Sequence, residues 1–160
     1  MGIDFDFDWL ITYVERVHDR TYEAAALLTE ELLEWRPAHG EWTAAELVTH
    51  IANSRLMNSA NIAGGGLHYA GHEPPPRPTP QVLCRHLEYT STKTLERLRN
   101  ADLAGTARTV AGSEVPAFMP VFGGLIEHEV HHRSQLCEYL AAAGVEPPPL
   151  YGLHEEDLPG

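Results

Sequence analysis

Three histidines lie within five residues near the C-terminal end of the chain, in the segment His128-Glu129-Val130-His131-His132. His128 and His132 are four residues apart, so on a helix their side chains lie one turn apart on the same face. The axial step between them is about 6 Å, which lets both imidazoles reach one metal ion. Because neutral imidazole is the commonest protein metal ligand, the pair predicts two ligands of a metal site.

The helix that carries this pair is expected to turn it toward a protein interior. At about 100° per residue, the pair shares one narrow stripe with four other side chains: Val121, Leu125, Leu136 and Tyr139. Two histidines whose hydrogen bonds are satisfied within a core are the simpler interpretation, but two on one buried stripe favour metal ligation. His131 points about 80° away from the pair, which indicates a place at the rim of a pocket.

A third imidazole can come from His50, in the first half of a helix expected from Thr43 to about Ile62. Three histidines with an open fourth position are typical of catalytic zinc sites, whereas closed sites are structural. Ligand type alone allows zinc, nickel or iron. Three further side chains near the inner face of the same helix are either pocket residues or groups that cap and solvate the helix: Glu46, Asn53 and Asn61.

The remaining histidines have weaker claims to ligation. His18 and His86 flank apolar stripes and are expected to be partly buried helix residues. Four others fall in expected loops and are predicted to be solvated: His39, His68, His72 and His154.

The same segment also matches the His-Glu-x-x-His motif of metallopeptidases, in which the glutamate is the general base. The extended form of that motif fails at Gln135 and Glu138, although a downstream carboxylate such as Glu155 could supply a third ligand. Many peptidases hold an extended substrate along a sheet edge, and the chain predicts no such sheet. This alternative requires Glu129 to reach a water on the metal.

Four amphipathic helices are expected to position these residues, within one domain spanning residues 1–160. They run from about Phe7 to Leu33, from Thr43 to Ile62, from Pro80 to about residue 100, and from about Pro120 to Ala143. Thr43 to Glu46 forms a capping box, and prolines mark the first positions of the last two helices. A loop with five prolines joins the second and third helices, and an irregular crossover with a short hairpin precedes the fourth. This pattern predicts an all-α four-helix bundle.

Composition excludes several classes of function. Lys plus Arg is 11 against 23 for Asp plus Glu, a formal net charge of −12, which disfavours nucleic acids and anionic membranes as partners. No apolar run reaches the roughly 18 residues of a membrane span, and the acidic N-terminus does not resemble a signal peptide. Cys84 and Cys137 fit no metal or redox motif, so we expect two buried thiols in a cytoplasmic protein.

Several motifs taken together resemble the DinB/YfiT-like family of metal-dependent hydrolases. They are Trp35-Arg36-Pro37, Glu41-Trp42-Thr43 followed by His50, the segment His128 to Gln135, and the helix end Leu140 to Gly144 followed by prolines. The segment resembles the family signature His-x-x-x-His-Arg-Gly-Gln, with Ser134 in place of the glycine that follows the arginine.

The resemblance implies a four-helix bundle of unusual connectivity, often a homodimer, with nickel or zinc held by His50, His128 and His132. It also implies hydrolase activity or thiol-dependent S-transfer or isomerisation with a low-molecular-weight thiol. The small-molecule substrate is not specified by any residue. A non-catalytic, stress-associated dimer that keeps the metal for stability is the alternative from another class. Four aromatic residues lie on or near the first helix: Phe7, Trp9, Tyr13 and Trp35. Because Trp9 and Tyr13 lie off its main apolar stripe, they favour a dimer interface there. The alternative is that these aromatic residues complete the core of one subunit.

Overall fold

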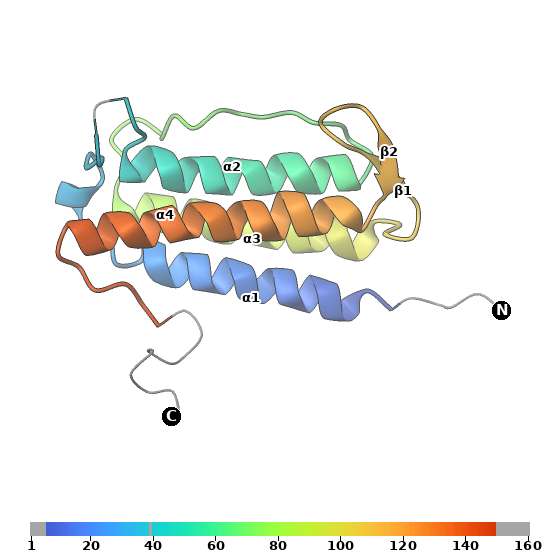
Figure 1. Ribbon diagram of the computed structural model, residues 1–160, viewed down its shortest axis with the longest axis horizontal. Helices are drawn as coiled ribbons and strands as arrows, with labels where there is room; N and C mark the ends of the chain where they lie inside the picture. The colour runs from blue at the N-terminus through green and yellow to red at the C-terminus, as the bar shows by residue number, and fades with distance from the viewer. Residues whose placement is uncertain (1–5, 39, 150–160) are drawn as a thin grey trace.

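Four long helices pack side by side in the computed structural model, which describes residues 6–38 and 40–149 (Figure 1). They are α1 (Asp8–Ala25), α2 (Ala44–Ile62), α3 (Pro80–Asn100) and α4 (His128–Ala142). Helices α1 and α2 each contact both α3 and α4. Because α2 and α3 run in the same direction, the connection between them, residues 63–79, passes back along α2 (Figure 1). The predicted all-α four-helix bundle is confirmed.

The starts of α2 and α3 follow the capping signals in the sequence. The Thr43 side chain accepts a hydrogen bond from the Glu46 backbone N–H at 3.1 Å, and the Glu46 carboxylate accepts one from the Thr43 N–H at 2.7 Å. This is the predicted capping box, so Glu46 stabilises the helix end, the capping role that was one of its two expected roles. At the start of α3, the Thr79 side chain accepts a hydrogen bond from the Val82 backbone N–H at 3.2 Å, ahead of Pro80 at the first helical position.

The first helix is shorter than predicted: α1 ends at Ala25, and a turn and the 3₁₀ helix η1 (Glu30–Leu32) follow it. Leu28 and Leu33 are both buried, at 5% and 3% exposure. On a continuous α-helix, at about 100° per residue, they would lie about 140° apart, and Leu33 would fall about 40° beyond Ile11 at the edge of the buried face of α1. Breaking the helix allows both leucines to pack over the end of the bundle.

The fourth helix begins near Pro120 as predicted, but its first turns form the π-helix η2 (Val121–Glu127). Before it lies the short hairpin of β1 (Thr106–Arg108) and β2 (Glu114–Pro116), with Ala107 paired to Val115. A Cβ on Gly124 would collide with the Asn58 side chain of α2, so this glycine permits η2 to lie close to α2. The hairpin stands at the end of the bundle where α2 and α3 end (Figure 1).

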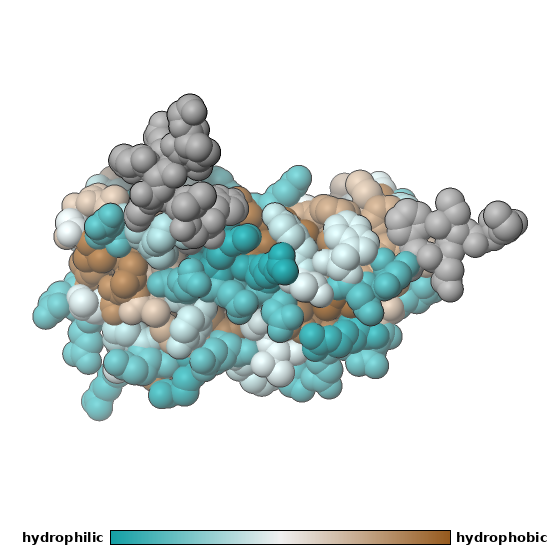
Figure 2. Space-filling model, turned by 90° about the horizontal axis from the view of Figure 1, so that it is seen from below, coloured by the Kyte–Doolittle hydropathy of each residue, from teal (hydrophilic) through white to brown (hydrophobic). Residues whose placement is uncertain are grey.

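Apolar side chains from all four helices fill the core, and the surface is mostly hydrophilic. The face on the α1 side shows mainly hydrophilic residues with apolar areas between them (Figure 2).

Cys84 and Cys137 are half-buried and form no disulfide in the described part of the chain. Among the described helices, none is long and apolar enough to cross a membrane.

The aromatic residues of the N-terminal region divide into two groups. Phe7 stacks on Phe118 and Trp35 packs edge-on against Tyr139, so these complete the subunit core. Trp9 and Tyr13 remain 56% and 42% exposed on α1. We therefore expect light scattering to give twice the chain mass of 17.7 kDa at micromolar concentrations, and Trp9→Ser with Tyr13→Ser to shift the protein toward the monomer. A wild-type mass of one chain throughout that range would contradict the dimer.

Candidate metal centre

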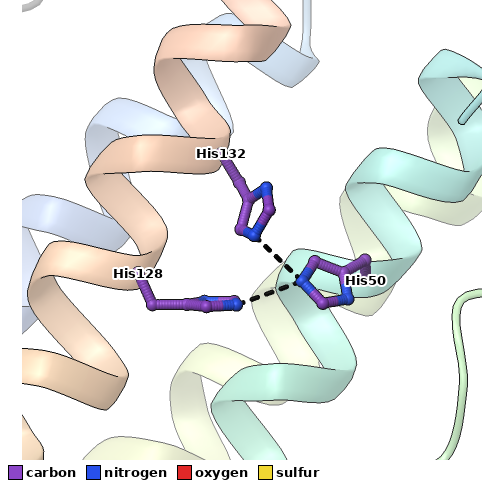
Figure 3. Close-up of side chains that lie close together, drawn as sticks. All are labelled: His50, His128 and His132. Atoms are coloured by element: carbon purple, nitrogen blue, oxygen red, sulfur yellow. Dashed lines mark hydrogen bonds between the residues drawn. The ribbon is translucent and has the colours of Figure 1, made fainter. Parts of the chain in front are cut away.

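Three imidazoles converge between α2 and α4. His50 projects from α2 toward His128 and His132 of α4, and its Nε2 atom lies 3.0 Å from the Nε2 atom of each (Figure 3). The possible ligand atoms of the three residues all lie within 4.8 Å of one another. Nitrogens bound to one zinc ion at about 2.0–2.1 Å lie about 3.3 Å apart in tetrahedral geometry, so the cluster has the size of a metal site.

In two of the three rings, the Nδ1 nitrogen, on the side of the ring away from the cluster, has a hydrogen-bond partner of its own. Nδ1 of His132 lies 2.7 Å from Oε1 of Gln135, and Nδ1 of His50 lies 2.6 Å from the hydroxyl of Tyr69. An amide oxygen only accepts, so His132 carries its proton on Nδ1 and presents a lone pair on Nε2. Partners of this kind fix the tautomer and orientation of metal-binding histidines. The donor set therefore fits a divalent metal.

The electrostatics of the cluster favour neutral imidazoles. Burial, followed by the neighbouring imidazoles, lowers the pKa of His50 to about 3. Burial and His132 likewise lower the pKa of His128 to about 4, and burial lowers the pKa of His132. All three rings are consequently uncharged at neutral pH, which is the form that binds a metal.

Aromatic side chains cover the cluster on one side. The ring centroid of Trp42 lies 4.4 Å from that of His50 and 4.9 Å from that of His72. His72 is therefore half-buried against Trp42, and the prediction that it is solvated is wrong. His131 is exposed beside His132, in keeping with its predicted place at the rim.

Comparison with known proteins gives the family. The sequence model of the DinB superfamily matches residues 13–136, more than half of the chain, and that of the DinB family matches residues 125–159. The chain belongs to the DinB superfamily. The resemblance predicted from the sequence motifs is thereby confirmed. Among curated proteins, no sequence matches the chain.

Solved structures of DinB-like proteins share the fold. A DinB-like protein from Bacillus cereus superposes with a TM-score of 0.73 at 22% identity, covering 87% of this chain and 93% of that one. The DinB-like protein YjoA from Bacillus subtilis gives 0.71 at 22% identity, with coverage of 88% and 96%. YfiT from Bacillus subtilis gives 0.65 at 17% identity, with coverage of 91% and 94%, and is described as a probable metal-dependent hydrolase with an unusual four-helix bundle topology.

Glu129 points away from the histidine cluster into the protein core. Its carboxylate accepts hydrogen bonds from Nε of Arg55 at 2.8 Å and from the hydroxyl of Thr21 at 2.6 Å, and it lies 3.5 Å from His18 Nε2. Burial alone would raise the pKa of this carboxyl, but the Arg55 guanidinium and then His18 lower it to about 2. A carboxylate engaged in this way is not a general base at the cluster, so the requirement of the metallopeptidase alternative is not met.

The other candidate side chains hold the structure around the site. Asn53 donates to the carbonyl of Gly71 at 2.8 Å and pairs with Nε2 of His86 at 2.9 Å, which fastens the returning connection to α2 and α3. Asn61 donates to the carbonyl of Arg108 at 2.7 Å and also lines a cavity. Of the remaining candidates, His68 is exposed as predicted, whereas His39, His154 and Glu155 lie outside the described residues.

Sequence reasoning missed four residues that shape the site: Trp42, Arg55, Tyr69 and Gln135. Gln135 lies three residues after His132, a helical spacing at which side chains meet, and this signal was available in the sequence. Tyr69 comes from an irregular connection, and Arg55 meets a glutamate 74 residues away, so neither contact had a local signal.

The buried His18 gives the fold a dependence on pH. Burial lowers its pKa to about 3 from the usual 6.5, while Nδ1 bonds to Ser91 at 2.8 Å. Below pH 6.5, His18 is protonated in the unfolded chain but stays neutral in the folded chain. The free energy of unfolding therefore falls by up to about 1.4 kcal/mol per pH unit because of this residue. Urea unfolding of the metal-free protein between pH 7.5 and 5 should show this loss together with that of the three cluster histidines, and the slope should be shallower in His18→Gln than in the wild type. Stability that does not vary over this range would contradict the burial of neutral imidazole.

Proposed function

We propose that this DinB-superfamily protein is a cytoplasmic, metal-dependent enzyme that acts on a small molecule through a divalent ion, zinc or nickel, held by His50, His128 and His132. The observation that carries the proposal is the convergence of three Nε2 atoms from two helices, with Gln135 and Tyr69 behind two of the rings. A neighbouring fold, YfiT, is described as a probable metal-dependent hydrolase, which supports the same class of reaction.

The residues of the chain orient and shield the site. Gln135 holds His132 with its Nε2 lone pair toward the cluster, and Tyr69 holds His50. Trp42 covers one side of His50 and limits the access of water there. When bound, the metal supplies Lewis acidity, which lowers the pKa of a coordinated water or thiol and yields a nucleophile near neutral pH. Three protein ligands are the number found in catalytic zinc sites.

Hydrolysis and thiol-dependent S-transfer or isomerisation are the two reaction classes that such a site supports. For a thiol reaction, the thiol must come from a small molecule. Burial raises the pKa of the Cys84 thiol and of the Cys137 thiol, which leaves both poorly nucleophilic. A low-molecular-weight thiol is therefore the second cofactor that we propose for this case.

A structural metal in a non-catalytic dimer remains the alternative, and the position of the cluster argues against it. The three histidines are half-buried and lie beside the apolar core, which packs α1 through α4 without them. We therefore expect chelation to remove the metal while circular dichroism retains its helical signal. Unfolding on chelation would favour the structural alternative.

The direct test is metal analysis of the purified protein, followed by assays with the metal removed and restored. We expect activity on a panel of small esters or in thiol transfer to disappear with chelator and return with zinc or nickel, while the helical content is unchanged. Activity that is indifferent to chelation, or a protein that fails to bind either ion, would refute the proposal.

A further inference from the structure

A cavity of about 450 Å³ lies directly beside the histidine cluster. It is enclosed by the C-terminal half of α2, the π-helix η2 and the β1–β2 hairpin, and its lining reaches His128. Binding sites for small molecules commonly measure about 300–1,000 Å³ and are mostly apolar with a few polar groups. The cavity is thus of the right size and in the right place to hold part of a substrate.

The walls of the cavity are mostly apolar. Six side chains supply apolar surface: Met57, Leu67, Val110, Val115, Met119 and Pro120. The one Lys or Arg among the described lining residues is Arg108. Among the described residues that line it, none is acidic, although the chain carries a net charge of −12. An apolar group therefore gains free energy by leaving water for this cavity, at about 0.8 kcal/mol for each methylene fully buried.

The two asparagines in the walls form hydrogen bonds that join the elements around the cavity. The side-chain amide of Asn58 donates to the carbonyl of Gly124 at 2.9 Å, which joins α2 to η2. The amide of Asn61 donates to the carbonyl of Arg108 at 2.7 Å, which joins α2 to the hairpin. Because both asparagines use their amide groups in this way, they hold the walls in place before any ligand binds. The exposed guanidinium of Arg108 is the charged donor that the walls retain.

The π-helix is what keeps the cavity open. Gly123 lines it without a side chain, and a Cβ built there would meet no atom within 4 Å. Its backbone does not require a positive φ, so the absence of a side chain is not explained by backbone strain. A larger residue at Gly123 fits the backbone and fills space that the present sequence leaves empty. π-Helical turns are frequent at functional sites.

His128 connects this cavity to the cluster. Its Nε2 atom faces His50, and within residues 6–38 and 40–149 its Nδ1 atom has no hydrogen-bond partner. We propose that the substrate is an amphipathic small molecule whose polar, reacting group lies at the histidine cluster while an uncharged aliphatic or single-ring arm fills the cavity. This inference rests on the proposed function and adds the class of substrate to it.

The first experiment tests the cavity without metal. Met57 and Met119 are two of the three methionines of the chain and both line the cavity, so ¹³C-methyl methionine NMR reports on it directly. We expect n-hexanol to shift both signals of the metal-free protein in a saturable way. Gly123→Leu should abolish the response, and so should a second blocking variant, Val115→Trp. Phe122→Ala, a neighbour that packs on Trp9, is the matched control and should respond like the wild type.

The second experiment tests the connection to the cluster. Alkyl hydroxamates of increasing chain length, from acetohydroxamate to hexanohydroxamate, are titrated calorimetrically into zinc-loaded protein. Affinity should rise about three- to fourfold per methylene, which corresponds to about 0.8 kcal/mol, and the dependence on chain length should vanish in Gly123→Leu.

The outcomes separate this inference from the proposed function. Zinc binding with no hexanol-induced shift, or with hydroxamate affinities independent of chain length in the wild type, would overturn the inference and leave the metal site standing. A saturable hexanol response in a protein that binds neither zinc nor nickel would refute the proposed function and the amphipathic substrate, and leave an apolar ligand site alone.

Discussion

His128→Ala is expected to lose almost all bound zinc or nickel, whereas His131→Ala is expected to keep a stoichiometric amount. His128 contributes one of three converging Nε2 atoms, while the ring of His131 is exposed beside the cluster. Affinity should fall more than about 100-fold in His128→Ala, because even the loss of a group that only orients a ligand costs about 10–100-fold. Element analysis of both purified variants measures the difference.

Gln135→Ala provides a graded comparison for this result. Its side chain touches Nδ1 of His132 at 2.7 Å, so the ring stays but loses its orientation. We expect an intermediate loss of affinity, about 10–100-fold, in a competition titration with a chromophoric chelator. Equal metal loss from the His128 and His131 variants would show that the ligands are wrongly assigned.

Glu129→Gln should destabilise the fold by about 3–5 kcal/mol and leave metal binding intact. The change leaves the guanidinium of Arg55 without its anionic partner in a site where both side chains are 2% exposed, and an uncompensated buried charge costs this much. Urea unfolding gives the free energy, and zinc titration gives the affinity. Glu127→Gln, an exposed carboxylate two residues earlier, is the control and should change stability little.

A double variant distinguishes a buried charge from lost packing. Arg55→Met with Glu129→Met removes both charges, and we expect it to recover much of the stability that Glu129→Gln loses, because apolar replacement of a buried ion pair is often neutral. A Glu129→Gln protein that is fully stable and binds metal, yet loses hydrolysis, would restore the general-base role that the buried position of Glu129 argues against.

The sequence predicted best what short-range geometry controls. The Thr43–Glu46 capping box began α2 where expected, and the four-residue spacing of His128 and His132 put both rings on one face. His50 could be placed because its helical phase and the bundle architecture together limit where it can point. Each of these features depends on a few adjacent residues or on a helical repeat.

Features that depend on distant partners were not predictable in this way. The break after Ala25 reflects the need to bury both Leu28 and Leu33, which is a property of the assembled bundle. The close approach of the π-helix to α2 depends on the fit of Gly124 against Asn58. The direction of Glu129 depends on Arg55, which is 74 residues away, and it is opposite to the direction that the metallopeptidase alternative requires.

The connection along α2 also has a kinetic consequence. It brings Tyr69 to His50 and the Gly71 carbonyl to Asn53, and the histidines themselves meet across 78 and 82 residues of chain. Contacts between segments so far apart form only after long loops close, which places them late in folding. We therefore expect an ion bound there to stabilise interactions that form after the transition state for folding. Zinc is therefore expected to lower the unfolding rate constant in stopped-flow experiments and to leave the folding rate constant nearly unchanged. The zinc-loaded protein would then gain its stability from a longer lifetime of the native state and not from faster folding.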